Sequence, residues 1–404
     1  MKYISLKKMF HINEQECNSL YLRRFISESS HKIGIEINGY ECFYLINDEV
    51  LKLIDDIYEI NMWLEKVMDH DTFPALSKNY LCVSTLIEEI RSTNKIEGIN
   101  STRKELKDII VNGPPKKYVR FYGLVNKYEK LLKEEFISIE TSSDIRKLYD
   151  EILLKDILDE DEEDNPDGII FRSQTVEVRS SLDVIHKGIT GEKNIIEIMD
   201  KSLKILNDTN INFLIRTAVF HYLFEYIHPF YNGNGRMGRF LASGYLSKHL
   251  NILCALQFSV ACIHNHNKYY EAFKMTNDIR NKSDLTVFII YFLEIYLSGL
   301  KELKEHIEST LNKYTYIKGK IDQLLDNKYL NLLDILLQST FFNIDDGLTM
   351  DQIVSLTKIT EQTIRKMIKN INKDFNIIKI DNANKPYKYA IDIENIYKQT
   401  NSFE

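Results

Sequence analysis

Residues 228–239 read HPFYNGNGRMGR, a stretch in which one histidine is followed by three glycines and two arginines. The preceding residues 211–227 space their apolar side chains three and four apart, and residues 235–250 resume the same spacing. Because this periodicity is typical of buried helices, the stretch is predicted to be a loop that joins two helices. It offers few side chains to a core, which indicates a ligand-binding role.

The predicted loop combines an anion-binding backbone with a base. Glycines let the backbone approach a ligand, and the N–H groups at the start of a helix carry a partial positive charge. Arg236 and Arg239 stand in the first helical turn, where cations are unfavourable unless a bound anion offsets them. His228 is mostly neutral near pH 7 and can accept a proton. Together these groups predict transfer chemistry on a phosphate ester, with a polyphosphate bound in the loop.

The whole chain excludes several classes of protein. Its 404 residues suggest two or three domains, and 52 basic against 59 acidic residues argue against nonspecific nucleic-acid binding by the chain at large. Five cysteines lie far apart without a C-x-x-C pair, so they are expected to be buried thiols in a reducing compartment. The first residues hold no secretory signal, and no run of about 18 apolar residues could span a bilayer. A cytoplasmic protein that does not enter a membrane is therefore expected.

Helical periodicity dominates the rest of the sequence. Only 15 glycines and 6 prolines interrupt it, so the fold class is predicted to be mainly α. Residues 31–48 are an exception, because they alternate around Asn38-Gly39 and predict a β-hairpin.

Two long amphipathic helices are predicted next, over about residues 48–68 and 77–98. A capping box of Thr102 and Glu105 begins a third helix. The Pro-Pro dipeptide at 114–115 ends that helix and marks a boundary.

An acidic run, DEDEEDNPDG at 159–168, interrupts the helices that follow. Consecutive acids most often form a solvated loop, and that interpretation is favoured over an acidic recognition tail. The next stretch, GIIFRSQTVEVRSS at 168–181, alternates and is rich in β-branched residues, which predicts a strand or hairpin within the helical domain. A two-stranded hairpin is marginally stable alone, so it is expected to lean on the helices.

The loop resembles the motif of Fic family proteins, H-x-F-x-[D/E]-G-N-G-R-x-x-R. The residues that match its fixed positions are His228, Phe230, Gly233, Asn234, Gly235, Arg236 and Arg239. Such a match in a helix–loop–helix context is far more specific than a lone glycine motif. The resemblance covers about residues 80–300, and it implies a Fic-type helical core with a β-hairpin flap and an N-terminal helical regulatory region.

This resemblance implies a protein adenylyltransferase. His228 would take the proton from a Ser, Thr or Tyr hydroxyl of a target protein or of the chain itself, and the hydroxyl would attack the α-phosphorus of ATP. Pyrophosphate would leave, and AMP would stay on the protein. The groups implied to hold the phosphates are Gly233, Gly235, Asn234 and the loop N–H groups on the α-phosphate, Arg236 on the β-phosphate and Arg239 on the γ-phosphate. Phe230 would anchor the loop in the core.

Two further regions resemble family features. Residues Thr175, Val176, Glu177 and Val178 resemble the flap that aligns a target segment by strand addition. Tyr269 and Tyr270 resemble the region that meets the adenine base, although two adjacent tyrosines on their own more often belong to core or surface packing.

Asn232 departs from the motif. The family has Asp or Glu there as the protein ligand of Mg²⁺, whereas an amide oxygen can touch Mg²⁺ or Mn²⁺ but contributes no charge. Relatives with altered loops transfer UMP, phosphocholine or phosphate, so these donors stay open beside the favoured AMP.

A second motif lies upstream, where TNKIEG at 93–98 resembles the inhibitory signature [S/T]-x-x-x-E-[G/N] of the family. Thr93 and Glu97 are four apart and share a helical face. The alternative is an ordinary helix end at Gly98. The resemblance implies the class with an N-terminal inhibitory helix, in which Glu97 pairs with Arg239 and denies ATP its γ-phosphate site. In some relatives this glutamate also helps to remove AMP, so a reversible enzyme is open as well.

The last hundred residues resemble a winged helix-turn-helix, with a capping box at Thr349 and a two-stranded wing at 376–391. Residues 349–391 carry eight basic and four acidic residues, a net charge of +4. Arg365, Lys366 and Lys369 are predicted on the exposed side of the second helix, where they suit the phosphates of duplex DNA. A protein-docking or dimerising module, which would make the protein a homodimer, explains the same basic face equally well.

Four segments are expected from these signals. They are an N-terminal extension at 1–60, a helical region with the inhibitory motif at 61–113, a Fic core at 118–310 and a winged helix at 325–404. The favoured function is an autoinhibited AMP transferase that uses ATP with Mg²⁺ or Mn²⁺. The alternative is a DNA-binding transcriptional regulator whose Fic core is weakened at Asn232.

Overall fold

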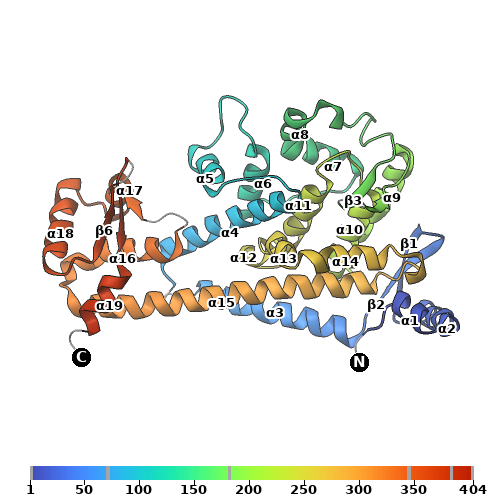
Figure 1. Ribbon diagram of the computed structural model, residues 1–404, viewed down its shortest axis with the longest axis horizontal. Coiled ribbons are helices and arrows are strands. Elements are labelled where there is room, and N and C mark those ends of the chain that lie inside the picture. The colour runs from blue at the N-terminus through green and yellow to red at the C-terminus, as the bar shows by residue number, and fades with distance from the viewer. Residues whose placement is uncertain (1–2, 70–72, 181–182, 344–346, 383–384, 402–404) are drawn as a thin grey trace. The chain divides into compact units, whose positions relative to one another are not determined.

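The computed structural model describes residues 3–69, 73–180, 183–343, 347–382 and 385–401 (Figure 1). The chain divides into two compact units. Unit 1 comprises Met1–Trp63 and Leu86–Lys301, and unit 2 comprises Leu64–Thr85 and Glu302–Glu404. Both are built mainly from helices, as predicted. The finer division of the chain into four segments stays a prediction.

Unit 1 begins with two short helices and a hairpin. These are α1 (Leu6–Ile12), α2 (Glu14–Phe25), β1 (Ser30–Ile37) and β2 (Tyr40–Leu45). The predicted hairpin is confirmed, because β1 and β2 pair in antiparallel fashion across Asn38-Gly39. Asn38 and Gly39 have φ values of 54° and 78°, the positive values that a two-residue hairpin turn requires.

The long helices predicted next are present as α3 (Asp48–Asp69) and α4 (Ala75–Ile96). The capping box at Thr102 and Glu105 is also present and begins α5 (Arg103–Asn112). The side chain of Thr102 accepts from the N–H of Glu105, and the Glu105 carboxylate accepts from the N–H of Thr102. Helix α5 ends just before the two prolines, as expected.

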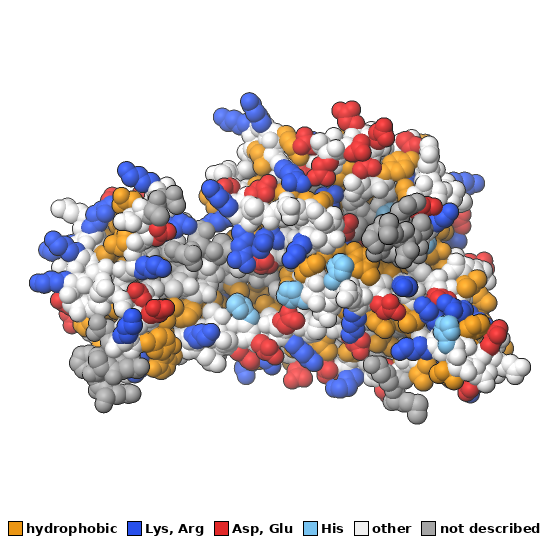
Figure 2. Space-filling model, in the orientation of Figure 1, with side chains coloured by type: hydrophobic (Ala, Val, Ile, Leu, Met, Phe, Trp, Pro, Cys, Tyr) orange, Lys and Arg blue, Asp and Glu red, His pale blue; other side chains and the backbone are white. Residues whose placement is uncertain are grey.

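The acidic run lies among short helical pieces. These are α6 (Tyr122–Leu132), α7 (Ser142–Tyr149), a π-helical turn (Asp150–Leu154), α8 (Lys155–Glu160) and a 3-10 turn (Glu162–Asp164). The run therefore starts inside α8 and is more regular than the predicted loop, but its side chains from 159 to 163 are exposed. Figure 2 shows the acidic side chains gathered over the α8 region of this face.

The predicted hairpin near the loop is confirmed as β3 (Glu177–Ser180) and β4 (Asp183–Lys187), which pair in antiparallel fashion with a register shift after Val178. The helices that follow are α9 (Glu192–Asn207), α10 (Phe213–Ile227), α11 (Asn234–Leu246), α12 (Ile252–Ala255), α13 (Phe258–His264), α14 (His266–Thr276) and α15 (Thr286–Leu324). Helix α10 packs against both α9 and α11 (Figure 1). Every residue of α11 is buried, so the predicted loop opens directly into the core of unit 1.

Unit 2 ends in a small mixed region. Its elements are α16 (Asn327–Phe342), β5 (Leu348–Thr349), α17 (Met350–Thr357), α18 (Glu361–Asp374), β6 (Ile378–Asp381), β7 (Lys388–Ile391) and α19 (Ile393–Asn401). The strands form an antiparallel sheet in the order β5-β7-β6. The predicted capping box at Thr349, the turn before α18 and the paired wing strands are present. Part of the predicted wing, Ala383 and Asn384, lies outside the described residues, and the winged-helix assignment stays a prediction.

All five cysteines are free thiols, as their spacing predicted. Within the described ranges, no helix combines the length and the apolar character needed to cross a membrane.

Candidate active site

The loop between α10 and α11 is shaped by its caps. His228 caps α10 in the left-handed conformation, with φ 52° and ψ 64°, and its N–H donates to the carbonyl of Phe224. Gly233 caps α11 with φ 80°, and a Cβ there would lie 2.8 Å from Cδ1 of Ile157. A residue with a side chain would be strained at Gly233 and would clash.

Two residues hold the loop closed. The N–H of Phe230 donates to Oδ1 of Asn234 over 2.9 Å, and Nδ2 of Asn234 donates to the carbonyl of Phe230 over 2.8 Å. The Phe230 ring is buried and stacks on Tyr149 at a centroid distance of 3.6 Å. Phe230 therefore lies where an anchor is expected, while the amide of Asn234 is engaged within the loop.

A cavity of about 270 Å³ brings seven of the predicted site residues together, whereas Arg236, Asn232, Gly233 and Asn234 are not part of its lining. Its lining residues are Glu97, Glu177, His186, Glu225, Tyr226, His228, Gly235, Arg239, Tyr269, Tyr270, Phe273 and Asn277. They come from the end of α4, the β3–β4 hairpin, α10, α11 and α14, so distant parts of the sequence meet at the loop.

Glu97 and Thr93 both bind Arg239 in this cavity. Nη2 of Arg239 donates to Oε1 of Glu97 over 2.7 Å and to the carbonyl of Thr93, and Nε donates to Oγ1 of Thr93 over 2.9 Å. Burial alone would lower the pKa of the Arg239 guanidinium, but the Glu97 carboxylate raises it overall. The pairing that the sequence predicted between Glu97 and Arg239 is thus present.

Gly235 is required by this contact. A Cβ at Gly235 would lie 2.2 Å from Oε1 of Glu97 and 2.9 Å from Nη1 of Arg239. The first turn of α11 therefore has space for a carboxylate or a phosphate oxygen only because residue 235 lacks a side chain.

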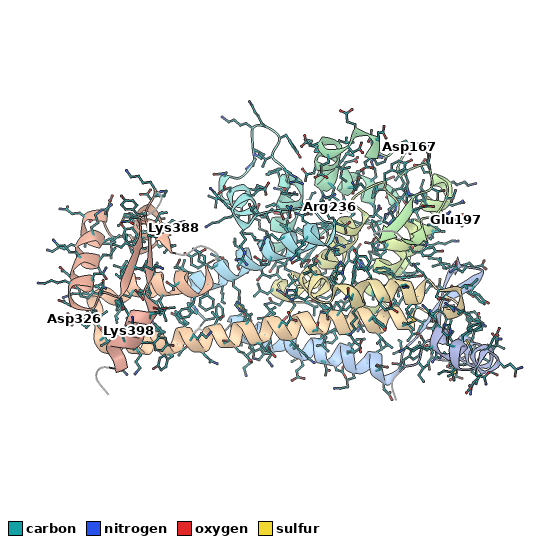
Figure 3. The ribbon with its side chains drawn as sticks, viewed as in Figure 1. Asp167, Glu197, Arg236, Asp326, Lys388 and Lys398 are labelled. Atoms are coloured by element: carbon teal, nitrogen blue, oxygen red, sulfur yellow. The ribbon has the colours of Figure 1, made fainter. Side chains whose placement is uncertain are left out.

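Arg236 is a buried cation whose donors are not satisfied. It projects from the first turn of α11 (Figure 3), and its side chain is 1% exposed. Its Nε and Nη2 have no hydrogen-bond partner among the described residues. Burial lowers its pKa, and nearby carboxylates oppose that shift. A buried guanidinium with open donors is costly, so the site fits an anion.

His228 fits the role of a base. Burial lowers the pKa of its imidazole to about 4, so the ring is neutral at physiological pH. Its Nδ1 is buried and has no partner among the described residues. A neutral ring nitrogen at the edge of an anion site can accept a proton from an approaching hydroxyl.

The two tyrosines differ in environment. Tyr269 is buried, and its hydroxyl lies 2.9 Å from Nε2 of His221, whose Nδ1 lies 3.3 Å from the carbonyl of Gly238. Burial lowers the pKa of His221 to about 3. Tyr269 is therefore fixed to α11 through a neutral histidine, and both Tyr269 and Tyr270 line the cavity. Contact of this pair with a nucleotide base stays a prediction.

Asn232 is not among the residues that line the cavity, and its amide is bound at both ends. Its Nδ2 donates to Oδ2 of Asp164 over 2.8 Å, and its Oδ1 accepts from the N–H of Gly233 over 2.6 Å. Within the described residues, no three His, Cys, Asp or Glu side chains are grouped to hold a metal ion. A metal at this loop would therefore depend on ligand oxygens as well as on the protein.

The β3–β4 hairpin is tied to the loop at its base. Arg172 is buried, and it donates from Nε to the carbonyl of His228 over 2.7 Å and from Nη2 to the carbonyl of Ile189 over 2.8 Å. Of the predicted flap residues, Glu177 lines the cavity and pairs with Lys187.

The remaining flap residues are placed mainly by their backbone. The carbonyl of Val176 accepts from Gly188, and the hydroxyl of Thr175 lies 2.8 Å from that of Thr190. Val178 pairs with His186, and its side chain lies outside the described part of the structure.

Sequence reasoning missed three residues that shape the site. Glu89 is fully buried and accepts hydrogen bonds from Ser243 and Ser259, which fastens α4 to α11 and α13. Its spacing offered a signal, because 89, 93 and 97 share one helical face. Arg172 and Glu225 were missed as well. Of these two, Glu225 lies three residues before His228, a position that could have suggested a role, whereas Arg172 offered no such signal.

Comparisons with known proteins identify the family of the region that contains the loop. Residues 139–246 match the Fic/DOC family. The chain is similar to a Fic family protein from Desulfovibrio desulfuricans G20, with 18% identity, a TM-score of 0.53 and coverage of 86% of this chain and 97% of that one.

Two further solved structures give lower TM-scores. Fic-1 from C. elegans has 16% identity and a TM-score of 0.40, and the match covers 65% of this chain and 72% of that one. A Fic domain containing signaling protein from Bacteroides thetaiotaomicron VPI-5482 has 16% identity and a TM-score of 0.40, and the match covers 63% of this chain and 94% of that one. Only the similarity to the D. desulfuricans protein has a TM-score above 0.5, and at 18% identity it supports the fold alone. The chain therefore contains a domain of the Fic/DOC family at residues 139–246.

Proposed function

We propose that this protein is an autoinhibited adenylyltransferase that moves AMP from ATP to a Ser, Thr or Tyr hydroxyl of a target protein or of itself. The observation that carries the proposal is Arg236, a buried guanidinium with two unpartnered donors in the loop that follows the neutral base His228. Such a cation favours a phosphate over any neutral ligand.

The proposed reaction gives each of these groups a role. The target hydroxyl gives its proton to His228, and its oxygen forms a bond to the α-phosphorus of ATP. The bond from the α-phosphorus to the oxygen that bridges to the β-phosphate breaks, and pyrophosphate leaves with that electron pair. Arg236 and the N–H groups at the start of α11 stabilise the charge on the phosphate oxygens.

Autoinhibition is proposed from the contact between Glu97 and Arg239. In the proposed arrangement Arg239 holds the γ-phosphate, but its Nη2 already binds Oε1 of Glu97 over 2.7 Å. A γ-phosphate would meet a carboxylate at this position and be repelled. ATP would therefore bind productively only after Glu97 moves, and the same carboxylate could orient a water molecule that removes AMP in reverse.

Mg²⁺ or Mn²⁺ is proposed to accompany ATP. The hard oxygen donors near the loop are the amide of Asn232 and the carboxylate of Asp164, and this chemistry fits a divalent cation that keeps most of its contacts to phosphate and water. The metal would neutralise phosphate charge and orient the leaving group.

The test is label transfer from ATP labelled at the α-phosphate, with Mg²⁺ or Mn²⁺, by the purified protein and by its Glu97→Gly variant. Label on the chain or on an added lysate protein supports the proposal, and later loss of that label would reveal the reverse reaction. If label is transferred from UTP or from a choline donor and not from ATP, the transferred group is UMP or phosphocholine instead of AMP. If neither protein transfers label from any of these donors, the proposal that the chain is a transferase is refuted.

A second function is proposed for the end of unit 2. Arg365, Lys366 and Lys369 are exposed on one helix, α18, although Arg365 also pairs with Glu361 over 2.7 Å. Figure 2 shows Lys and Arg side chains over the α18 region. An exposed basic helix next to a paired β-ribbon suits duplex DNA, and DNA binding here would make the protein a regulator as well as, or in place of, an enzyme.

A further inference from the structure

The carboxylate missing from position 232 is replaced in space by a neighbouring residue. Asn232 uses both ends of its amide, since Oδ1 accepts from the N–H of Gly233 over 2.6 Å and Nδ2 donates to Oδ2 of Asp164 over 2.8 Å. The amide therefore fastens Asp164, 68 residues earlier in the chain, to the loop. An aspartate at 232 would repel Asp164. The carboxylate of Asp164 can therefore lie beside position 232 because that position carries an amide.

Asp164 is available to a cation. It ends the 3-10 turn Glu162–Asp164 and is half-buried. Among the described residues its Oδ2 is bound to Asn232, its Oδ1 has no hydrogen bond, and no Lys or Arg forms an ion pair with it. A carboxylate that is partly withdrawn from water without a cation is electrostatically unfavourable, unless a cation arrives with the ligand.

The same loop independently indicates an anionic ligand. Arg236 has two buried donors without partners. The Tyr149 hydroxyl donates to the carbonyl of Asn232 over 3.1 Å, and its ring stacks on Phe230.

We propose that Asp164 binds the divalent cation of the metal–nucleotide complex and that Asn232 positions it, so that the two residues together replace the single acidic residue of the Fic motif. This inference rests on the proposed function, because the metal arrives with the nucleotide. It also gives the acidic run after α8 a role beyond a solvated surface. Divalent Mg²⁺ prefers a charged oxygen ligand to an amide, which favours Asp164 over Asn232 as the protein ligand.

The experiment measures binding rather than turnover. The Glu97→Gly protein is titrated by calorimetry with α,β-methylene-ATP, in which the bond broken during AMP transfer is blocked, once with EDTA and once with Mn²⁺. The dissociation constant in EDTA divided by that in Mn²⁺ gives the factor by which the metal strengthens nucleotide binding. Adding Asp164→Asn is expected to lower that ratio about ten- to a hundredfold while the constant in EDTA changes little.

Charge relocation provides the second arm. Asp164→Asn combined with Asn232→Asp moves the carboxylate across the hydrogen bond and should restore the ratio to within a few-fold. Glu162→Gln is the matched control, since it removes the same charge from the same turn without touching Asn232, and its ratio should stay unchanged. Circular dichroism melts confirm that each variant is folded.

The outcomes separate the two claims. Metal-dependent nucleotide binding that Asp164→Asn leaves unchanged would overturn the role of Asp164 and leave the proposed function standing. Loss of affinity in EDTA and Mn²⁺ alike would mean that Asp164 only supports the loop, which also overturns it. Failure of the Glu97→Gly protein to bind the nucleotide in either condition would overturn both.

Discussion

The carboxylate of Glu97 lies 2.7 Å from Nη2 of Arg239, although 142 residues separate them in the chain. Arg239 is only 1% exposed, whereas the Glu97 side chain is 29% exposed, so solvent reaches this ion pair from the Glu97 side alone. It places the end of α4 directly on the loop that holds the proposed phosphate site. A change at either residue should therefore be felt at the other.

Glu97→Gly should raise self-labelling from ATP. Removing the carboxylate frees Arg239 for the γ-phosphate, and the expected gain is about five- to a hundredfold, the usual range of coupling between two sites. Glu97→Gln should act in the same direction and controls for the backbone freedom of glycine. Equal labelling of all three proteins would show that the contact does not inhibit.

His228→Ala in the Glu97→Gly background should lower transfer at least about a hundredfold, because a general base is removed. The affinity for α,β-methylene-ATP should stay within a few-fold, since Arg236 and the N–H groups of α11 do the binding. Calorimetry and labelling are run on the same preparations. A large loss of nucleotide affinity would assign His228 a structural role instead.

The loop of the site and several turns and helix ends of the fold could be predicted from the sequence, because their signals are local. The loop at 228–239, the turn at Asn38-Gly39 and the capping boxes at Thr102 and Thr349 each depend on residues within a few positions of one another. Helices α1 and α2 were not predicted, because short helices carry weak periodicity.

The contacts between distant segments could not be predicted in the same way. The hydrogen bond between Asp164 and Asn232 depends on how the segment after α8 packs on the loop, which no local pattern encodes. The spacing of Glu89 could place it on the face of Thr93 and Glu97, but not identify Ser243 and Ser259 as its partners. Asn232 by itself suggested only a weakened metal site. The structure adds a carboxylate beside it, which changes what the departure from the motif implies.

Glu225 should make the stability of unit 1 depend on pH. Burial raises the pKa of its carboxyl to about 8, against opposing attraction from Arg239, and its Oε1 has no hydrogen-bond partner within the described part of the chain. Between about pH 4.5 and 8 the unfolded chain has lost a proton that the folded chain keeps, so stability falls as pH rises through this window.

Glu225→Gln should remove that part of the slope. Urea unfolding of both proteins from pH 5 to 8.5 measures the difference, and comparing the two cancels the other groups that titrate in this range. His228 and His221 act with the opposite sign, since their lowered pKa values make acid destabilising. Parallel stability curves for the two proteins would show that Glu225 keeps an ordinary pKa.

Glu89→Ala should both destabilise the protein and weaken inhibition. The substitution leaves the buried hydroxyls of Ser243 and Ser259 and the N–H of Ser259 without their acceptor, at about 1–3 kcal/mol for each group left unsatisfied. Because Glu89 fastens the helix that carries Glu97, self-labelling should rise although Glu97 is intact. Glu88→Ala, at a half-buried position of the same helix, is the control. A lower melting temperature with unchanged labelling would limit Glu89 to stability.

The final prediction concerns α18. If this helix binds DNA, Arg365→Ala combined with Lys369→Ala should weaken binding to duplex DNA and reduce the salt slope by about 1 for each phosphate that is no longer bound. Lys313→Ala with Lys328→Ala removes the same charge from exposed positions elsewhere in unit 2 and should leave the slope unchanged. Fluorescence anisotropy of a labelled duplex at salt concentrations from about 50 to 200 mM, over which the loss of phosphate-dependent affinity is large, measures both pairs. If the intact protein shows no salt-dependent binding, DNA binding by α18 is refuted, and the basic excess of four residues over 349–391 is left to the protein-docking alternative, which a pull-down with the same two variant pairs then tests.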